Sequence, residues 1–508
     1  MASSLSRRSR LAGAAIALVS AVALASCGGA EQPGAGSGSP DPDASLAVGL
    51  VLEPTNLDIR RTSGAALEQA LIGNVYEGLV ARGGEDEDIV TALASEWTVS
   101  DDGLAYTFTL HEGVTFHDGA TLEASDVVAS LTAVQDDEQL LGHDDLQVIE
   151  SISAPDDLTV EITLSRPDQN LLFALTGPAG LVFDEDDDTD MKTDANGTGP
   201  FSIGAWRQGD SLALARFDDY WGDPAGVAEA VLTYIPDQNA LVSAGLDGSL
   251  DAVTAVDADL APQLEGSFEL SEAPTTDKFV LAFNLDVPPL DDIRVREALR
   301  LAIDHDAILE VVGAGSSLFG PIPEPDPGYE DLSDVAPHDP ERARELLADA
   351  GAEDLSLTLT IPSPYGNRVS TLLASQLQEV GVTLDVQPVE FSTWLQDVYA
   401  NGDYELSYVN HVEPRDFASW ADPDYYYGVD EETLPEVQDL YEQAMSATDA
   451  DASAELLAEA ARLVSENHPV DWLYAREDIV AVAPGIEGFP RTSTSTRLPL
   501  AGVTVEAP

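Results

Sequence analysis

The chain has 508 residues, which is enough for two or three hydrophobic cores, and its 22 basic and 93 acidic residues give a formal net charge of −71. So acidic a surface repels nucleic acid and anionic lipid headgroups, so no nucleic-acid partner is expected. Only one cysteine is present, so no disulfide can form within the chain.

The N-terminus has the pattern of a secretory leader. Arginines at positions 7, 8 and 10 precede an apolar run over residues 11–24 that is too short for a comfortable membrane span. We therefore predict a signal peptide over residues 1–26. The Gly-, Ser- and Pro-rich residues 27–45 are predicted to form a flexible tether.

The string Leu24-Ala25-Ser26-Cys27 resembles the lipobox of bacterial lipoproteins. The resemblance implies that Cys27 is lipidated and becomes the new N-terminus, and two acyl chains suffice for stable anchoring. The expected location is the outer face of the cell membrane. An ordinary signal peptide with an incidental cysteine is the alternative.

Alternating and helical patterns predict the first elements of the mature chain. Residues 46–52 predict a strand, and apolar side chains at helical spacing predict a helix over 67–79. Strict alternation predicts a strand over 106–110. A second alternating piece at 114–116 completes a predicted hairpin, and a helix is expected over 125–131.

The middle of the chain predicts a strand-helix-strand unit. Asp339 and the following proline predict the start of a helix that a glycine ends at position 351. Strands are predicted over 355–361 and 382–386, and a helix over 368–380 joins them. Such a crossover is right-handed and gives parallel strands in one sheet, so this region is predicted to be α/β.

Two further elements follow this unit. A helix is predicted over 392–399 with Trp394, Leu395 and Val398 on one face, and a strand is predicted over 404–408.

The segment just past this strand is the main candidate site. It combines an imidazole, charges of both signs and a proline. Because ligands of open α/β sheets lie beyond the carboxyl ends of the strands, we expect His411, Glu413, Arg415 and Asp416 to bind a ligand. A structural ion pair is the alternative.

Aromatic residues follow this segment closely. Trp420, Tyr426 and Tyr427 are expected to form apolar walls of a pocket, with core packing as the alternative. His411 has no companion at metal-ligand spacing, so no metal site is expected.

A series of motifs resembles family 5 of the extracellular solute-binding proteins, the capture components of peptide, nickel and related ABC importers. The matching residues span about Leu46 to Phe489. His111 stands where the family usually has arginine. The motifs include Asp102-Gly103-Leu104, Phe116-His117-Asp118-Gly119, Gly197-Thr198-Gly199-Pro200-Phe201, Tyr220-Trp221-Gly222 and Arg294-Val295-Arg296-Glu297-Ala298-Leu299.

The resemblance implies an α/β fold of two hinged lobes, the class II periplasmic-binding-protein fold, with an extra α+β domain inserted in the N-terminal lobe. The hinge would lie near Phe283 and near Asp478. The implied boundaries are 46–88, 198–278 and 480–508 for lobe I, 89–197 for the inserted domain and 279–479 for lobe II.

The implied function is capture of an extracellular solute, most simply a peptide, and its delivery to ABC permease subunits by a monomer that needs no cofactor. Glu413 or Asp416 would pair with the α-ammonium of a peptide, and Arg415 would hold a carboxylate. Backbone groups near Asn284 and at the Thr198-Gly199 turn would bind the peptide main chain.

Enzyme motifs are missing. The glycine-rich residues 34–38 lack the serine order of a nucleophile elbow, and His111 lacks the second histidine of a zinc protease. A secreted hydrolase is therefore a minor alternative. A nickel chelate, an opine or an oligosaccharide as ligand, or a purely structural surface lipoprotein, are the others.

The charge imbalance makes a direct prediction about stability. Self-repulsion between carboxylates destabilises the compact state and is screened by salt, so the melting temperature should rise from dilute buffer to molar salt. A melting temperature that does not change over this range in a calorimetric scan would contradict the prediction.

Overall fold

The computed structural model describes residues 39–84, 88–365, 367–492, 494 and 496–507. The predicted signal peptide, Cys27 and most of the predicted tether lie outside these residues. No helix in the described part of the chain is long and apolar enough to cross a membrane.

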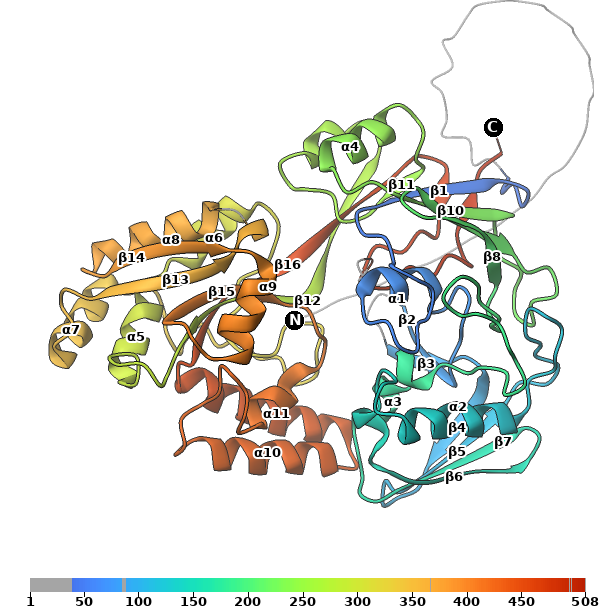
Figure 1. Cartoon of the computed structure of the whole chain (residues 1–508), viewed down its shortest axis with the longest axis horizontal. Helices are drawn as coiled ribbons and strands as arrows, with labels where there is room; N and C mark the ends of the chain where they lie inside the picture. Colours follow the sequence, from blue (N-terminus) through green and yellow to red (C-terminus); the bar gives the residue numbers. More distant parts are fainter. Residues whose placement is uncertain (1–38, 85–87, 366, 493, 495, 508) are drawn as a thin grey trace, which may run out of the picture. The chain divides into compact units, whose positions relative to one another are not determined.

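A ten-stranded mixed sheet runs through the described chain (Figure 1). The long strands β12 and β16 pair antiparallel at its centre. In sheet order the strands are β14 (Thr383–Val389), β13 (Ser356–Pro362), β15 (Leu406–His411), β12 (Glu269–Phe283), β16 (Val470–Val482), β11 (Ala252–Val253), β1 (Ser45–Leu50), β10 (Glu229–Tyr234), β9 (Ser211–Arg216) and β8 (Phe201–Arg207).

A separate antiparallel sheet has the order β4-β5-β7-β6, and the helix α2 packs on it. Its strands are β4 (Ala94–Val99), β5 (Ala105–Leu110), β7 (Thr159–Leu164) and β6 (Ile149–Asp156). The remaining elements are β2 (Val80–Gly83), β3 (Asp88–Thr91), β17 (Ile486–Glu487), β18 (Thr504–Val505), α1 (Ala65–Leu71), α2 (Ala124–Asp136), α3 (Leu171–Ala174), α4 (Gln238–Leu246), α5 (Ile293–Leu301), α6 (His305–Val312), α7 (Pro340–Ala350), α8 (Arg368–Glu379), α9 (Phe391–Trp394), α10 (Leu434–Ser446) and α11 (Ala450–Glu466).

Most predicted elements are confirmed to within a few residues. The predicted unit of two parallel strands and a helix corresponds to β13, α8 and β14. The strands β13 and β14 pair in parallel. Helix α7 begins after Asp339, whose side chain accepts a hydrogen bond from the backbone of Arg342, and it ends at Gly351 in the left-handed conformation.

The helix predicted over 67–79 is too long, because α1 ends at Leu71. The apolar side chains of this stretch are buried as expected. Beyond α1, however, the carbonyl of Asn74 accepts from Phe201 and that of Val75 from Gly199. These tertiary hydrogen bonds replace the helical ones, so the chain turns.

Three other local predictions are corrected. Residues 114–116 form only an isolated bridge between Thr115 and Thr121, and α2 begins at Ala124, before the predicted start. The helix predicted over 392–399 is α9 followed by a π-helical turn over Leu395–Ala400. Because a π-helical turn is wider than an α-helical one, Leu395 no longer lies on the buried face of the helix and is 40% exposed.

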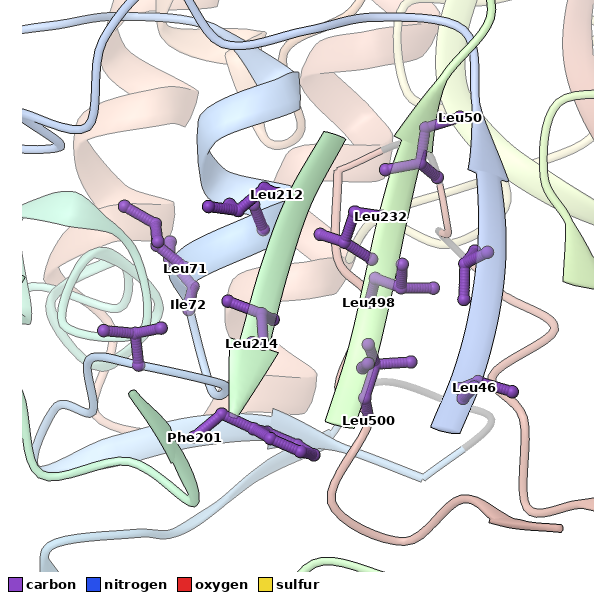
Figure 2. Packing of buried hydrophobic residues seen from close by; sticks show 14 of the residues in the cluster. Leu46, Leu50, Leu71, Ile72, Phe201, Leu212, Leu214, Leu232, Leu498 and Leu500 are labelled. Carbon is purple, nitrogen blue, oxygen red and sulfur yellow. The ribbon is translucent and has the colours of Figure 1, made fainter. Parts of the chain in front are cut away.

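Buried apolar side chains gather in several clusters. Figure 2 shows one in which Leu46 and Leu50 of β1 and Leu232 of β10 pack with Leu498 and Leu500 from the end of the chain. The core therefore joins segments that are far apart in sequence.

A buried ionic network ties α5 to β16. Arg300 is fully buried, and its Nε donates to Oδ1 of Asp471 at 3.1 Å. Its Nη1 donates to the carbonyl oxygen of Ser465 at 2.7 Å. Arg296, which belongs to the motif over residues 294–299, is 1% exposed and donates to the carbonyl of Asn467. The motif therefore holds α5 to the sheet.

Replacement of Asp471 by asparagine should lower the free energy of unfolding by about 3 kcal/mol, because it leaves the charge of Arg300 buried without its counterion. Urea unfolding followed by tryptophan fluorescence measures this loss, and Trp472, whose ring centroid lies 5.4 Å from the Arg300 guanidinium carbon, contributes to the signal. Asp218→Asn is the control, because its carboxylate is 82% exposed beside Arg216 and should cost less than about 1 kcal/mol. Equal losses in the two variants would contradict the prediction.

Candidate ligand-binding site

Lys278 of β12 organises the segment that follows β15. In the antiparallel pairing Lys278 lies opposite His411. Its side chain is 3% exposed, and Nζ lies 3.1 Å from Oδ1 of Asp416 and donates to the carbonyl oxygen of Glu413, also at 3.1 Å. One buried ammonium therefore holds two of the predicted site residues in place.

Arg415 is held by its backbone and presents its side chain to a distant part of the chain. Its φ is +52°, a left-handed conformation that non-glycine residues rarely adopt, and its backbone N–H donates to Oδ2 of Asp326 at 2.7 Å. The guanidinium carbon lies 4.1 Å from the ring centroid of Phe173 in α3. Burial lowers the pKa of the guanidinium.

The carboxylates of this group differ from surface acids. Burial raises the pKa of Asp326 and of Asp416, and the positive charge of Lys278 acts in the opposite direction on both. The carboxylate of Asp416 forms an ion pair with Lys278. The carboxylate of Asp326 accepts a hydrogen bond from the backbone N–H of Arg415.

An aromatic wall lies beside the charges. The hydroxyl of Tyr426 and Nε2 of His411 are 3.3 Å apart, and the ring of Tyr399 lies 4.9 Å from that of Tyr426. Burial, together with the charge of Lys278, lowers the pKa of His411 to about 4, so its imidazole is neutral at pH 7.

Two predicted wall residues belong to the core. Trp420 is 4% exposed and packs on Tyr425 and Trp472, with ring centroids 5.0 and 5.5 Å apart. Tyr427 is 2% exposed and packs on Tyr404. The alternative of core packing therefore describes both residues. Each packs against a tyrosine of the aromatic wall.

Asp416 borders two cavities. One, of about 250 Å³, is also lined by Arg415 and Asp326, by Asn170 and its neighbours, and by Tyr441 of α10. The other, of about 500 Å³, is lined by Tyr399, His411, Glu413, Tyr425 and Tyr426 together with three further polar residues. The predicted loop therefore lies between an apolar space and a more polar one.

The other predicted site residues lie elsewhere. Asn284 follows the far end of β12, where its side-chain amide donates to the carbonyls of Gly402 and Tyr404. The hydroxyl of Thr198 donates to Glu77, and Gly199 packs so closely on the backbone of Asn74 that a side chain there would clash. These three residues therefore serve local structure, and the structure does not bring them to the Lys278 group.

Sequence reasoning missed Lys278, Asp326 and Phe173. A signal for Lys278 was present, because it is one of only two lysines and directly precedes the apolar run over residues 279–283. Asp326 and Phe173 reach the site only through tertiary contacts with Arg415, which no local pattern encodes. Among the described residues, no group of three or more His, Cys, Asp or Glu side chains could hold a metal ion.

The pairing of Lys278 with Asp416 is testable by a double-mutant cycle. Lys278→Met alone should lower the free energy of unfolding by about 3 kcal/mol, because Asp416 loses its counterion. Lys278→Met combined with Asp416→Leu should cost at least about 1 kcal/mol less than the sum of the single changes.

The exposed pair of Arg342 and Glu345, 3.0 Å apart on α7, is the matched control. The same cycle there should give a coupling energy below about 0.5 kcal/mol. Additive losses at Lys278 and Asp416 in urea unfolding would contradict the inferred ion pair.

Comparisons with known proteins agree with this architecture. Residues 88–430 match the model of the bacterial extracellular solute-binding proteins, family 5. The chain is 30% identical over 401 residues to the glutathione-binding protein GsiB of Pectobacterium atrosepticum, which covers 75% of this chain and 76% of that protein. It is 29% identical to the dipeptide-binding protein of Escherichia coli over 373 residues, 66% of this chain and 70% of the other.

Solved structures share the fold. The periplasmic binding protein DppA of Helicobacter pylori, in complex with the peptide STSA, superposes with a TM-score of 0.75 at 21% identity and covers 92% of this chain and 98% of its own. The expected two-lobe periplasmic-binding-protein fold is thus confirmed, and the match over residues 88–430 shows that this chain belongs to family 5 of the bacterial extracellular solute-binding proteins.

Proposed function

We propose that this protein captures a short peptide outside the cytoplasm and delivers it to the permease of an ABC importer. The observation that carries the proposal is that Arg415 and Asp416 line one cavity together with Asn170 and Tyr441 from distant segments. A peptide presents one positive and one negative terminus, so a cavity with both charges and apolar walls matches it.

Each charged group has a separate task in this proposal. The exposed carboxylate of Glu413, which lines the second cavity that Asp416 also borders, pairs with the α-ammonium, and Asp416, already paired with Lys278, lies between the two cavities. Arg415 holds the carboxylate in a bidentate fork, supported by the Phe173 ring. The relatives named above for glutathione, dipeptides and the peptide STSA support this ligand class.

Nickel chelates and opines also carry carboxylates that Arg415 would hold. The apolar walls around Leu172 and Met445 favour a peptide with side chains over these small anions. Stacking of an oligosaccharide is less suited, because Trp420 is buried in the core. We infer no catalysis, because binding and release suffice for the importer role.

We propose that the lobes move about β12 and β16. On β16, Ala475 belongs to one hydrophobic core cluster and Ile479 to another. On β12, Val280 belongs to the first of these clusters and Leu270 packs against the second. A hinge near Asp478 fits this change, and on β12 it fits the stretch just before Val280 better than Phe283. The boundaries at 88, 197, 278 and 479 belong to the same proposal.

The proposed anchor and location complete the account. Lipidation at Cys27 would hold a monomer at the outer face of the membrane, and the tether would let it reach the permease. Globomycin inhibition of leader cleavage in cells, followed by mass spectrometry of the N-terminus, tests the anchor.

Calorimetric titration with alanine peptides of two to five residues tests the ligand class. Binding by the native protein is expected, and Arg415→Ala should weaken it at least about tenfold, the effect of losing a charge-assisted hydrogen bond. Arg344→Ala, an exposed arginine on α7 bonded to the carbonyl of Glu379, is the control and should leave the affinity unchanged. No binding, an unchanged affinity in Arg415→Ala, or peptide cleavage would contradict the proposal.

A further inference from the structure

The cavity of about 250 Å³ beside Arg415 is lined mainly by apolar side chains. Its charged lining residues, Asp326, Arg415 and Asp416, form one connected group, because Arg415 precedes Asp416 and donates its backbone N–H to Asp326. The larger apolar side chains of the lining are those of Ile89, Leu172, Ile322, Phe417, Met445 and Leu457. The cavity therefore combines one charged group with a large apolar surface.

The charged group suits one carboxylate of a ligand and no second one. Among the described residues that line the cavity, Arg415 is the single cation. Lys278, behind Asp416, is already paired with it at 3.1 Å. The carboxylates of Asp326 and Asp416, together with the nearby Glu413, disfavour a further negative charge. The remaining lining is therefore suited to an uncharged part of the ligand.

The volume of the cavity and the packing of its wall limit what it can hold. An engineered apolar cavity of about 150 Å³ in another protein binds benzene, so about 250 Å³ has room for one large side chain and part of its main chain. Ile322, Phe417 and Met445 are 5, 4 and 3% exposed, so packing holds these wall side chains in place.

The chemistry of a C-terminal residue matches this arrangement. Its carboxylate and its side chain branch from the same Cα atom, so a carboxylate held by Arg415 brings that side chain next to the apolar lining. The side chains of residues farther from the terminus are separated from the carboxylate by at least one peptide unit. The C-terminal side chain is therefore the part of a peptide that the cavity receives.

Two distant segments of the chain meet at this cavity. In the proposed domain division, Ile89 and Leu172 belong to the inserted domain and Met445 belongs to lobe II. Gln169, which also lines the cavity, joins the two parts. Its backbone N–H donates to the carbonyl oxygen of Met445 at 3.1 Å, and its side-chain amide donates to that of Ala447 at 2.7 Å. An apolar group in the cavity is therefore enclosed by both parts at once.

We propose that this cavity is the subsite for the side chain of the peptide's C-terminal residue and that it selects a large apolar side chain, such as that of leucine, methionine or phenylalanine. The inference rests on the proposed function and narrows it to peptides that end in such a residue. Arg415 keeps one role, at the terminal carboxylate. The apolar side chain favours the closed form, because its surface is removed from water only while the inserted domain and lobe II are together.

Three tripeptides that differ only in the last residue test the subsite by calorimetric titration. They are Ala-Ala-Leu, Ala-Ala-Ala and Ala-Ala-Asn, of which the asparagine peptide is close in size to the leucine peptide but polar at its end. The native protein should bind Ala-Ala-Leu at least about tenfold more tightly than either of the others, because it buries three further apolar carbon atoms than Ala-Ala-Ala.

Two substitutions in the lining should remove this preference. Leu172→Asn and Ile89→Asn each place a polar amide at the cavity, and both residues are only partly buried. Each variant should bring the ratio of affinities for Ala-Ala-Leu and Ala-Ala-Ala towards one. Leu158→Asn is the matched control, because Leu158 is partly buried against the same hydrophobic cluster but does not line the cavity. It should leave the ratio unchanged.

Thermal unfolding followed by circular dichroism shows which variants are folded, and either lining variant alone decides the test. Tripeptides that all bind with equal affinity would leave the peptide function standing and overturn the subsite. A ratio that stays at the native value in a folded lining variant would also overturn it.

4-Methylpentanoate separates this inference from the proposed function, because it has the carboxylate and a leucine-like chain but no amino group or peptide bond. If no tripeptide binds, ligand-observed NMR decides between two outcomes. Binding of 4-methylpentanoate that is lost in Leu172→Asn and kept in Leu158→Asn means that the peptide function fails and the apolar subsite stands. No binding, or binding that is the same in both variants, overturns the subsite as well.

Discussion

The buried ammonium of Lys278 is the interaction on which the site depends. A charge that is 3% exposed is stable only beside a counterion and hydrogen-bond acceptors, and Asp416 and the carbonyl of Glu413 supply them. These contacts fix the course of the chain after β15. The left-handed residue Arg415 then points its guanidinium at Phe173, on a segment more than two hundred positions away in sequence.

The net charge of the chain is strongly negative, whereas the candidate site places Arg415 at a cavity wall. Most of the acidic residues that the structure describes are not buried, and they lower the local concentration of any anionic solute, while Arg415 attracts a carboxylate at short range inside the cavity. Salt screens exposed charges over distances beyond about 8–10 Å but affects buried pairs much less. Moderate salt should therefore weaken the exterior repulsion more than the attraction inside the cavity.

Local signals in the sequence were sufficient for much of the α/β part. Asp339, Pro340 and Gly351 bound α7 because capping chemistry acts within a few residues, and alternation defined β13 and β14. The end of α1 could not be predicted in this way. It depends on hydrogen bonds from Gly199 and Phe201, which lie far along the chain and outweigh helical periodicity.

The candidate site was predictable only in part for the same reason. The rule that ligands lie beyond the carboxyl ends of strands located the loop with Glu413, Arg415 and Asp416, but the partners Lys278, Asp326 and Phe173 required the fold. The Thr198-Gly199 turn carries a strong family motif, and Asn284 was expected near the ligand main chain, yet both are used by local structure. A strong motif in this chain thus more often marks packing than ligand contact.

The central claim is that two hinged lobes close on a solute without chemical change. Small-angle X-ray scattering of the protein with and without a saturating peptide tests it most directly. The account predicts a smaller radius of gyration in the presence of the peptide and full return to the starting value after dialysis, with the peptide recovered intact. A radius of gyration that stays constant although calorimetry shows the peptide bound would contradict the claim.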